Sequence, residues 1–561
     1  MLINKLPSPN RTPLIHSLLL LLLFGLIGAI ITLSSVPPID RDSLTHHLYI
    51  PRLYLELGGM VELPELEFSY FPMNLEMLYL LPLALGNDII PKYIHFFFAL
   101  LSAVLIHRYL VSTLNRAYAL TGALFFLSLP IIVKLSITAY VDLGLLFFSA
   151  ASLLLLLKWT RETEKIWWLI LAGICCGLAV GTKYNGLITL LLLTLFVPVL
   201  YQRCAPQDNR SNLKACFFAI IFLAIALLAF SPWALRNTLW TGNPLYPLLG
   251  SVFGTEQTSV LGGMNFFLIR KFLYHESWWQ TLLIPLRIFF EGQDDNPQYF
   301  DGQLNPFLLL LPLFAFATRA QNRQERIEKL ALATFALLYI FLAFFQRDLR
   351  IRYIGPALVP LVLLSIFGLK NLMVLAGAIQ RHTIRRLALS GLTLLLAAVL
   401  LLNVQYITNL FAQVQPLPYL TGAVSRDAYI SRFRTEYPVF QLANQNLGRE
   451  DKILCVFTGN RGYYLKIDHF FDFRNNRSFL CDIISRINNP TEAFSLLRQN
   501  GFTHLIIRND LWQQWIKKSL PNENQLAYQA FQAKYLREIT RNDEYVLYEI
   551  QPLRSNQSSL P

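Results

Sequence analysis

The stretch TPLIHSLLLLLLFGLIGAIITLSSVPP, residues 12–38, contains no Asp, Glu, Lys or Arg. About 20 consecutive apolar residues suffice for a helix to cross a bilayer. The apolar core is too long for a signal peptide, carries no convincing small-residue cleavage site and is followed by further apolar runs, so we interpret residues 14–36 as a retained transmembrane helix. The chain then turns polar at IDRDSLTHHLYIP, residues 39–51.

The composition of the whole chain is typical of a multi-pass membrane protein. Of its 561 residues, 54% are hydrophobic and 15% are charged, whereas a soluble protein carries about 25% charged residues. The net charge of +13 is concentrated in short loops between apolar runs, as the positive-inside rule describes. We therefore expect an integral protein with a cytoplasmic N-terminus, surrounded by membrane lipids and without a nucleic-acid partner.

Eleven apolar runs are predicted to span the membrane. They cover residues 14–36, 89–107, 117–134, 142–157, 166–180, 187–201, 215–230, 306–317, 330–345, 353–369 and 387–404. With these spans, residues 1–404 form a transmembrane domain with two long outer loops, 37–88 and 231–304. In the first loop, PMNLEMLYLLPLALG (72–86) predicts a short helix at the outer surface.

Residues 405–561 do not resemble membrane spans and are predicted to form a small extracytoplasmic α/β domain. DKILCVF (451–457), THLIIR (503–508) and EYVLYEI (544–550) predict strands, and TEAFSLLRQNG (491–501) predicts a helix that ends at its glycine. This region holds Cys455 and Cys481, for which two alternatives stand: a disulfide in an oxidising compartment, or two buried thiols.

The first outer loop concentrates titratable side chains. A carboxylate at a membrane surface can act as a general base or hold a divalent cation. Asp40 and Asp42 share a face of an extended segment, whereas Asp42 and His46 share a face of a helix that begins at Asp42. The structural alternative is that Asp42 or Ser43 caps an interfacial helix over residues 43–57, ended by two glycines.

Two further ionisable residues stand at the ends of apolar runs. Asp142 begins a span in TAYVDLGLLFF (138–148), and an ionisable group at such a depth is costly and usually functional. Lys183 in GTKYNG (181–186) falls on the expected outer side, against the positive-inside bias. It could bind an anionic phosphate as a point charge. The structural alternatives are a helix N-cap for Asp142 and snorkelling to lipid headgroups for Lys183.

A group of arginines precedes the tenth span. FFQRDLRIRYIGPALVP (344–360) places Arg347, Arg350 and Arg352 on the same expected outer side. Guanidinium groups bind phosphate oxygens through forked hydrogen bonds, and the alternative is a salt-bridged loop that includes Asp348. Carboxylates and cations thus collect on one side of the membrane, which predicts a site for an acidic, lipid-linked substrate. The sequence contains no P-loop or dinucleotide-binding glycine pattern, so the energy for a reaction must come with the substrate.

These features together resemble the GT-C superfamily of multispanning glycosyltransferases, which includes protein O-mannosyltransferases and the aminoarabinose transferase of lipid A. The resemblance lies in DRDSLTHH in the first outer loop, a Pro-containing outer helix, AYVDL after the third span, the GLAVGTKYNGL turn, RIRYIGPALVP and a terminal outer α/β domain. It is strongest to bacterial members whose first loop reads D-x-L-T-x-H, and it implies the bacterial inner membrane as location.

The resemblance implies inverting transfer of a sugar from a polyprenyl-phosphate or polyprenyl-diphosphate carrier to a glycan, lipid or protein acceptor. It implies Asp42 as the general base, with Asp40 as the alternative, and Asp142 as the group that orients the acceptor or a cation. The carrier phosphate would be bound by Lys183, Arg350, Arg352 and Tyr353, while His46 and His47 would bind the acceptor or a metal. Metal use varies in the superfamily, so a divalent cation stays open. The serine next to Asp42 argues against a two-carboxylate metal site.

Two other classes of protein share some of these features. A transporter or flippase of lipid-linked sugars would also contain charged groups, but it would more often show internal repeats and broken helices near the bilayer midplane. A non-catalytic envelope-assembly protein could be built on the same fold. Loss of activity on replacing Asp42 by Asn would favour the enzyme over both.

Overall fold

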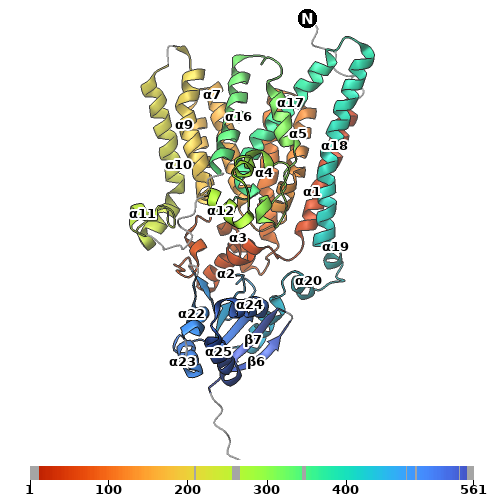
Figure 1. The fold of residues 1–561 in the computed structure, drawn as a ribbon. Helices are drawn as coiled ribbons and strands as arrows, with labels where there is room; N and C mark the ends of the chain where they lie inside the picture. Colours follow the sequence, from red (N-terminus) through yellow and green to blue (C-terminus); the bar gives the residue numbers. More distant parts are fainter. Residues whose placement is uncertain are drawn as a thin grey trace, which may run out of the picture. The chain divides into compact units, whose positions relative to one another are not determined.

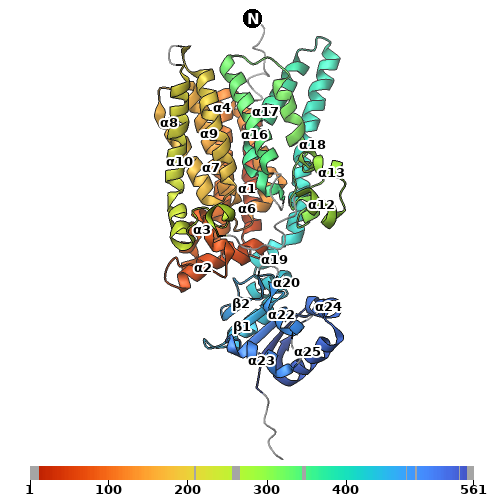
Figure 2. The ribbon, with the colours of Figure 1, turned by 60° about the vertical axis from the view of Figure 1, so that its left-hand side comes forward.

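The computed structural model of the protein describes residues 12–207, 210–255, 266–343, 349–474, 477–486, 489–542 and 544–552. The chain forms two compact units. The first consists of residues 1–36, 60–256 and 264–420, and its described part is built of helices. The second consists of residues 37–59, 257–263 and 421–561 and contains the strands. Figure 1 labels many of these elements, and Figure 2 shows them from another side.

Seven helices of the described chain are long and apolar enough to cross a membrane. They are α1 (Thr12–Ser34), α4 (Ile90–Thr113), α7 (Asp142–Arg161), α9 (Gly186–Cys204), α10 (Asn212–Thr241), α17 (Gly355–Gly377) and α18 (His382–Val414). Helices α5 (Arg116–Ser128) and α6 (Pro130–Ser136) together make an eighth span that is bent by 65°. The bend falls at Pro130, which begins α6 and cannot continue the hydrogen bonding of α5.

Each of the eleven predicted spans falls on a helix, but three of them lack the length or composition of a full span. Helix α8 (Ile166–Thr182) and the segment of α15 (Phe307–Leu313) with η5 (Phe314–Phe316) are apolar but short, and α16 (Arg323–Ala343) begins among charged residues. Length and composition therefore support seven or eight spans. The predicted class, a polytopic α-helical membrane protein with a small C-terminal α/β region, is confirmed.

Helices α7 and α17 are the most enclosed of the seven spans, and α1 and α18 are the most exposed. In the most apolar window of α7 and of α17, 72% of the residues are buried, against 11% in α1 and in α18. Lipid tails are as apolar as leucine, so the exposed apolar side chains of α1 and α18 are suited to contact with lipid. On α7, by contrast, Asp142, Ser149 and Ser152 are buried within the protein.

Helix α10 extends beyond its predicted end. The sequence ends this span just before Pro232, whereas the helix continues through Pro232 to Thr241. Proline removes one helix hydrogen bond and crowds the preceding turn. The added turns are held by buried side chains, because Arg236 and Asn237 both donate hydrogen bonds to the carbonyl oxygen of Tyr70, at 2.7 and 2.9 Å. The predicted short surface helix is confirmed as α3 (Asn74–Ala84).

The second unit is a mixed five-stranded sheet in the order β2-β1-β5-β7-β6. Its strands are β1 (Lys452–Val456), β2 (Asp468–Phe471), β5 (His504–Arg508), β6 (Leu536–Arg541) and β7 (Tyr545–Ile550). Strand β1 runs parallel to β2 and β5, while β7 runs antiparallel to β5 and β6. The predicted strands β1, β5 and β7 and the helix α23 (Pro490–Gln499) are confirmed; β2 and β6 were not predicted.

Alternate residues of the central strands pack into two separate cores, one on each face of the sheet. Leu454 and Ile507 belong to one core with α22 (Phe479–Arg486), α23, α24 (Asn509–Ser519) and α25 (Asn522–Tyr535), while Ile506 belongs to the other with α21 (Tyr437–Asn446). Cys455 lies in the second core and Cys481 in the first, and both are free and buried. The alternative of two buried thiols is therefore correct, because the sheet separates them.

Candidate functional site

A buried ion pair lies at one end of the helix bundle. Asp142 is the first residue of α7, and its Oδ1 lies 2.7 Å from the Nζ of Lys183, which follows the last residue of α8. The side chain of Asp142 is 1% exposed and that of Lys183 is 21% exposed. The Oδ2 of Asp142 is buried and makes no hydrogen bond with any described residue. Asp142 therefore pairs with Lys183 rather than capping its own helix.

The start of α7 is held by a histidine that the sequence did not single out. His95, fully buried on α4, accepts a hydrogen bond from the backbone N–H of Leu143 through Nε2, at 2.9 Å. Its Nδ1 lies 2.9 and 3.0 Å from two backbone carbonyl oxygens, so Nδ1 carries the proton and the ring is neutral. This bond satisfies one of the unpaired N–H groups of the helix start and fixes the position of Asp142.

Two aromatic rings and an arginine complete the cluster around Lys183. The ammonium group of Lys183 lies 5.0 Å from the ring centre of Tyr353, in the short 3-10 helix η6 (Ile351–Ile354) just before α17. The guanidinium group of Arg352 lies 5.0 Å from the ring of Tyr140 and 5.5 Å from that of Tyr353. These are cation–π distances. Lys183, Arg352, Tyr353 and Asp142, all predicted as site residues, thus lie in one cluster, which we call the Asp142 cluster.

Glu76 on α3 belongs to the same neighbourhood and was missed in the sequence. Its side chain is buried, and burial raises its pKa to about 8, with the charges of Lys183, Asp142 and Arg236 acting on it as well. A carboxyl group with this pKa is mostly protonated at neutral pH. The signal in the sequence was a single acidic residue inside an apolar helix, a pattern that often marks a functional group.

Glycine allows the turn that carries Lys183 to pack closely against α3. A Cβ atom on Gly181 would lie 2.4 Å from the Nδ2 of Asn74, which is closer than atoms can approach. Asn74 itself donates a hydrogen bond to the carbonyl oxygen of Leu178 and accepts one from Trp233 Nε1, at 3.2 and 2.7 Å. The predicted GTKYNG turn is thus fixed between α3 and α10.

Arg350 lies in a different group of charges. Its guanidinium group lies 3.3 Å from Asp301, whose other oxygen lies 3.2 Å from Lys134. Lys134 also pairs with Asp294 at 3.3 Å and with Asp295 at 3.4 Å. For Arg350 the salt-bridged alternative is therefore correct, with Asp301 as partner. Arg347 and Asp348, the other charged residues of this motif, lie outside the described residues.

The predicted residues of the first outer loop belong to the second unit. Asp40 and Asp42 are half-buried, and Asp42 precedes a single π-helical turn, η1 (Ser43–His47), which is followed by α2 (Tyr49–Glu56). The side chain of Asp42 makes no capping hydrogen bond with the described residues, so the capping alternative is wrong for it. The predicted helix over residues 43–57 is confirmed in outline, with a π turn at its start; such turns are frequent at functional sites.

The two histidines lie within and at the end of the π turn. His46 is half-buried, and its Nδ1 lies 2.8 Å from Thr45 Oγ1. His47 is 5% exposed, and its ring centre lies 4.1 Å from that of His46. Among the residues that the structure describes, no three His, Cys, Asp or Glu side chains are grouped so that they could hold a metal ion.

The loop segment 37–59 is hydrogen-bonded to β2 and to the segment between β1 and β2. Tyr49 OH lies 2.8 Å from Nε2 of His469 on β2, and the backbone N–H of Tyr463 donates to Leu44 O at 3.2 Å. The guanidinium group of Arg52 donates to the carbonyl oxygens of Tyr463 and Leu465. The C-terminal region therefore carries the loop with Asp40 and Asp42, which the sequence had assigned to the transmembrane domain.

Comparisons with known proteins agree with this fold. A family model described as dolichyl-phosphate-mannose-protein mannosyltransferase matches residues 78–239, from α3 into α10. This part of the chain includes Asp142 and Lys183 but neither Asp42 nor Arg352. No curated protein matched the sequence significantly.

Solved structures match over nearly the whole chain. The crystal structure of ArnT from Cupriavidus metallidurans bound to undecaprenyl phosphate matches with a TM-score of 0.56 and 14% identity, covering 96% of this chain and 98% of that one. Its apo structure matches with a TM-score of 0.55. The archaeal oligosaccharyltransferase AglB from Archaeoglobus fulgidus, in complex with an inhibitory peptide and a dolichol-phosphate, matches with a TM-score of 0.50 and 12% identity, covering 99% of this chain and 75% of that one.

The fold is therefore that of the GT-C superfamily of multi-pass membrane glycosyltransferases, as the sequence resemblance predicted. At 12–14% identity the likeness concerns the fold. The activity of this chain has to be argued from its own residues.

Proposed function

We propose that this chain is an inverting glycosyltransferase that moves a sugar from a polyprenyl-phosphate carrier to an acceptor at the outer face of the bacterial inner membrane. The observation that carries the proposal is the Asp142 cluster, in which Lys183, Arg352 and Tyr353 converge at the ends of α7, α8 and α17. ArnT and AglB were solved with undecaprenyl phosphate and dolichol-phosphate respectively, which supports a carrier lipid of this class.

The charges of the cluster favour an anionic group. Lys183 and Arg352 bring two positive charges and Asp142 one negative charge, while Glu76, with its pKa raised to about 8, brings little negative charge at neutral pH. The cluster is thus net positive and mostly buried. A phosphate placed beside it would be bound by the lysine as a point charge and by the arginine through forked hydrogen bonds.

The same groups would assist departure of the carrier. In the proposed step, the acceptor hydroxyl oxygen attacks the anomeric carbon, the bond from that carbon to the phosphate oxygen breaks, and polyprenyl phosphate leaves with inversion. Negative charge grows on the leaving phosphate oxygen, where Lys183 and Arg352 would stabilise it. The hydroxyl proton passes to a carboxylate, for which the family pattern supplies Asp42, with Asp40 as the alternative.

Asp142 has a positioning role in this proposal. Its carboxylate fixes the lysine ammonium group at 2.7 Å, and it would act on the acceptor through this lysine, since its second oxygen is buried. His46 and His47 would contribute to acceptor binding in the segment that holds Asp42. The described acidic and histidine side chains do not converge as a metal-ligand set, so no step of this proposal passes through a cation.

The proposal is tested by mass spectrometry of envelope glycolipids, glycans and glycoproteins from cells that lack the gene and cells complemented with variants. We expect a glycan modification that is lost without the gene, restored by the wild type and by Asp482→Asn, an exposed acidic control in the second unit, and lost with Asp42→Asn or Asp142→Asn. An unchanged glycan profile would contradict the proposal in favour of an assembly role. A redistribution of lipid-linked sugar across the membrane, without loss of any product, would favour a flippase.

A further inference from the structure

A polar cavity lies in the first unit, and none of the Asp142 cluster residues lines it. Its volume is about 450 Å³, and it lies between the C-terminal half of α18, Pro130 at the start of α6 and the segment 293–306. This volume is within the range of about 300–1,000 Å³ found for small-molecule sites. No residue of this cavity except Asp294 is charged.

The lining of the cavity is dominated by carboxamide side chains. Helix α18 contributes Asn403, Gln405, Asn409 and Gln413, and the segment 293–306 contributes Gln293, Gln303 and Asn305. Because Gln405, Asn409 and Gln413 are spaced by four residues, they follow one face of the helix. The side chains of these three residues are exposed and that of Gln303 is half-buried, and the four amide groups make no hydrogen bond with any described residue. They are therefore available to a ligand.

The other polar groups of the cavity are held in place. Asn403 accepts a hydrogen bond from Asn305 and donates one to Ser128, both at 2.8 Å. Tyr406 donates to the Oδ2 of Asp294 at 2.6 Å, and the other oxygen of this carboxylate lies 3.3 Å from Lys134 Nζ. The one negatively charged side chain of the lining is thus held between Tyr406 and Lys134.

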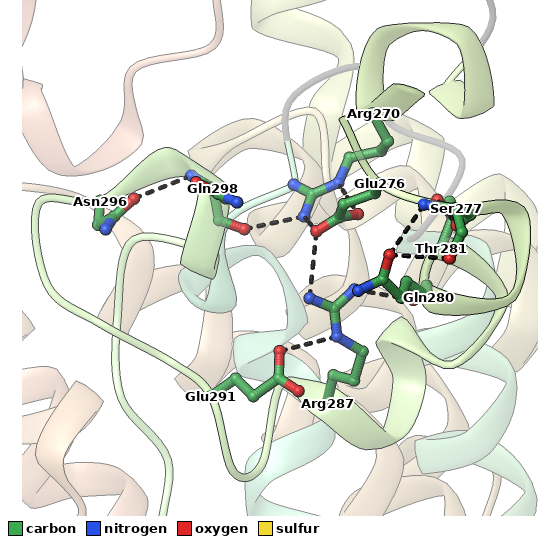
Figure 3. Close-up of polar contacts among 9 residues, drawn as sticks. All are labelled: Arg270, Glu276, Ser277, Gln280, Thr281, Arg287, Glu291, Asn296 and Gln298. Atoms are coloured by element: carbon green, nitrogen blue, oxygen red, sulfur yellow. Dashed lines mark hydrogen bonds and ion pairs between the residues drawn. The ribbon is translucent and has the colours of Figure 1, made fainter. Parts of the chain in front are cut away.

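The loop that supplies six of the fourteen lining residues is anchored by a buried ion-pair cluster (Figure 3). Arg270 pairs with Glu276 at 2.6 Å, both side chains being 4% exposed, and it also donates to the carbonyl oxygen of Gln298 at 2.8 Å. Arg287 pairs with Glu276 at 3.1 Å and with Glu291 at 2.8 Å. These bonds fix both ends of the turn between Glu291 and Gln298, just before Gln303. The lining is therefore preorganised.

This chemistry selects an uncharged, hydroxyl-rich ligand. An apolar ligand would cover four amide groups without giving them partners, and each amide that it removes from water would cost its desolvation. An anionic ligand would need a free cation, whereas the neighbouring Lys134 is already shared among three aspartates. A carboxamide presents one acceptor and two donors in one plane, so it can bond two adjacent hydroxyl groups, each of which both donates and accepts.

We propose that this cavity is a binding subsite for a neutral sugar, with the ring hydroxyls bonded by Gln303, Gln405 and Asn409. The sugar could be part of a membrane glycolipid or of a soluble saccharide, since both present the same hydroxyl groups. The inference does not depend on the transfer reaction proposed above, because a transporter with this cavity would bind sugar as well.

Saturation-transfer NMR with the full chain in phosphatidylcholine nanodiscs, which contain no sugar, tests the proposal. The probes are the methyl glycosides of glucose, mannose and galactose, maltose, and a galactosyl diacylglycerol added to the bilayer. We expect at least one probe to bind and the double variant Gln405→Leu/Asn409→Leu to weaken its binding about tenfold or more, from the loss of several hydrogen bonds. Binding of the galactolipid alone would identify a glycolipid as the source of the sugar, and binding of the free glycosides a saccharide.

The controls separate binding from folding. Thr408→Val lies on the same helix but outside the lining, and it should bind as the wild type does. Gln303→Leu removes an amide from the segment 293–306, on the other side of the cavity from α18, and it too should weaken binding. These leucine substitutions should not disturb the fold, because the replaced amides make no hydrogen bond with any described residue. Wild-type binding by both leucine variants, or no binding of any probe by the wild-type protein, would overturn the proposal.

Discussion

The ion pair between Asp142 and Lys183 allows a quantitative prediction from a double-mutant cycle. The perturbations are Asp142→Asn, Lys183→Met and the two combined. The carboxylate is 1% exposed and the ammonium group 21% exposed, with 2.7 Å between them. The carboxylate cannot reach solvent when its partner is removed, whereas the lysine can do so in part.

The expected magnitudes differ for the two single variants. Removing one partner of a buried pair costs about 3–5 kcal/mol because an uncompensated charge stays buried, and this applies to Lys183→Met. Asp142→Asn loses a charge-assisted hydrogen bond but leaves the more exposed lysine, at a cost of about 1.5–3 kcal/mol. The double variant buries no unpaired charge, so it should be more stable than Lys183→Met. We expect a coupling energy of about 2 kcal/mol or more, within the range for residues in contact.

The assay is equilibrium unfolding in mixed detergent micelles, followed by tryptophan fluorescence. The matched control is Lys158→Met at the other end of α7, where the exposed ammonium group lies 3.5 Å from the ring centre of Trp168; it should cost about 1 kcal/mol or less. Strictly additive effects of the two single variants, with a coupling energy below about 0.5 kcal/mol, would refute a direct pair.

Three further predictions concern the pH response and the packing of each unit. Because burial raises the pKa of Glu76 from 4.5 to about 8, the folded state retains a proton that the unfolded state loses. Stability should therefore fall as the pH rises from about 4.5 to about 8, and Glu76→Gln should flatten this dependence in the same unfolding assay. Burial lowers the pKa of His469 from 6.5 to about 4, so the second unit should lose stability as the pH falls through this interval. Over the same fall in pH, opening of β1 and β2, measured by hydrogen exchange, should increase in the wild type and change less in His469→Gln. A Cβ atom on Gly177 of α8 would lie 2.2 Å from the carbonyl oxygen of Ala226 on α10, so Gly177→Ala should lower the free energy of unfolding by about 1–3 kcal/mol. The control Gly25→Ala, at a position with open space around it, should leave this free energy almost unchanged. Equal effects of the two substitutions would contradict the close approach of α8 and α10.

Much of the fold could be predicted because it follows from local patterns. Apolar runs of about 20 residues and alternating strands are local signals. Every predicted span therefore falls on a helix and every predicted strand on a strand, although three of the helices lack the length or composition of a full span. The end of α10 could not be predicted in this way. Beyond Pro232, side chains of the helix donate hydrogen bonds to the carbonyl oxygen of Tyr70, more than 150 residues earlier in the chain.

The candidate site was predicted in part, for a physical reason. Asp142 and Lys183 stand out because an ion in an apolar context is costly, and they do form a pair. Glu76 and His95 carry the same signal, but each looked like a minor polar residue within a helix until the fold placed it beside α7. Arg350 was predicted to bind phosphate, but it forms an ion pair with Asp301. The motif around Arg350 gives no indication of this distant partner.

The attachment of the first loop to the C-terminal region was beyond the reach of sequence patterns. Tyr49 and His469 are 420 positions apart, and nothing local to either residue indicates the other. The choice between a disulfide and two thiols could not be made from the sequence either. Side chains at adjacent strand positions point to opposite faces of a sheet, and only the tertiary structure shows that Cys455 and Cys481 belong to different cores.

The central claim is that the Asp142 cluster binds the phosphate of a polyprenyl carrier. Native mass spectrometry of the full chain with undecaprenyl phosphate, and with uncharged undecaprenol as the comparison, tests this claim directly. We predict that the wild type retains undecaprenyl phosphate in preference to undecaprenol and that Arg352→Gln and Lys183→Met each reduce this preference about tenfold or more, since each removes a charge-assisted contact. Lys158→Met should leave the preference unchanged. Equal retention of the two lipids by the wild type, or an unchanged preference in both cluster variants, would contradict the claim.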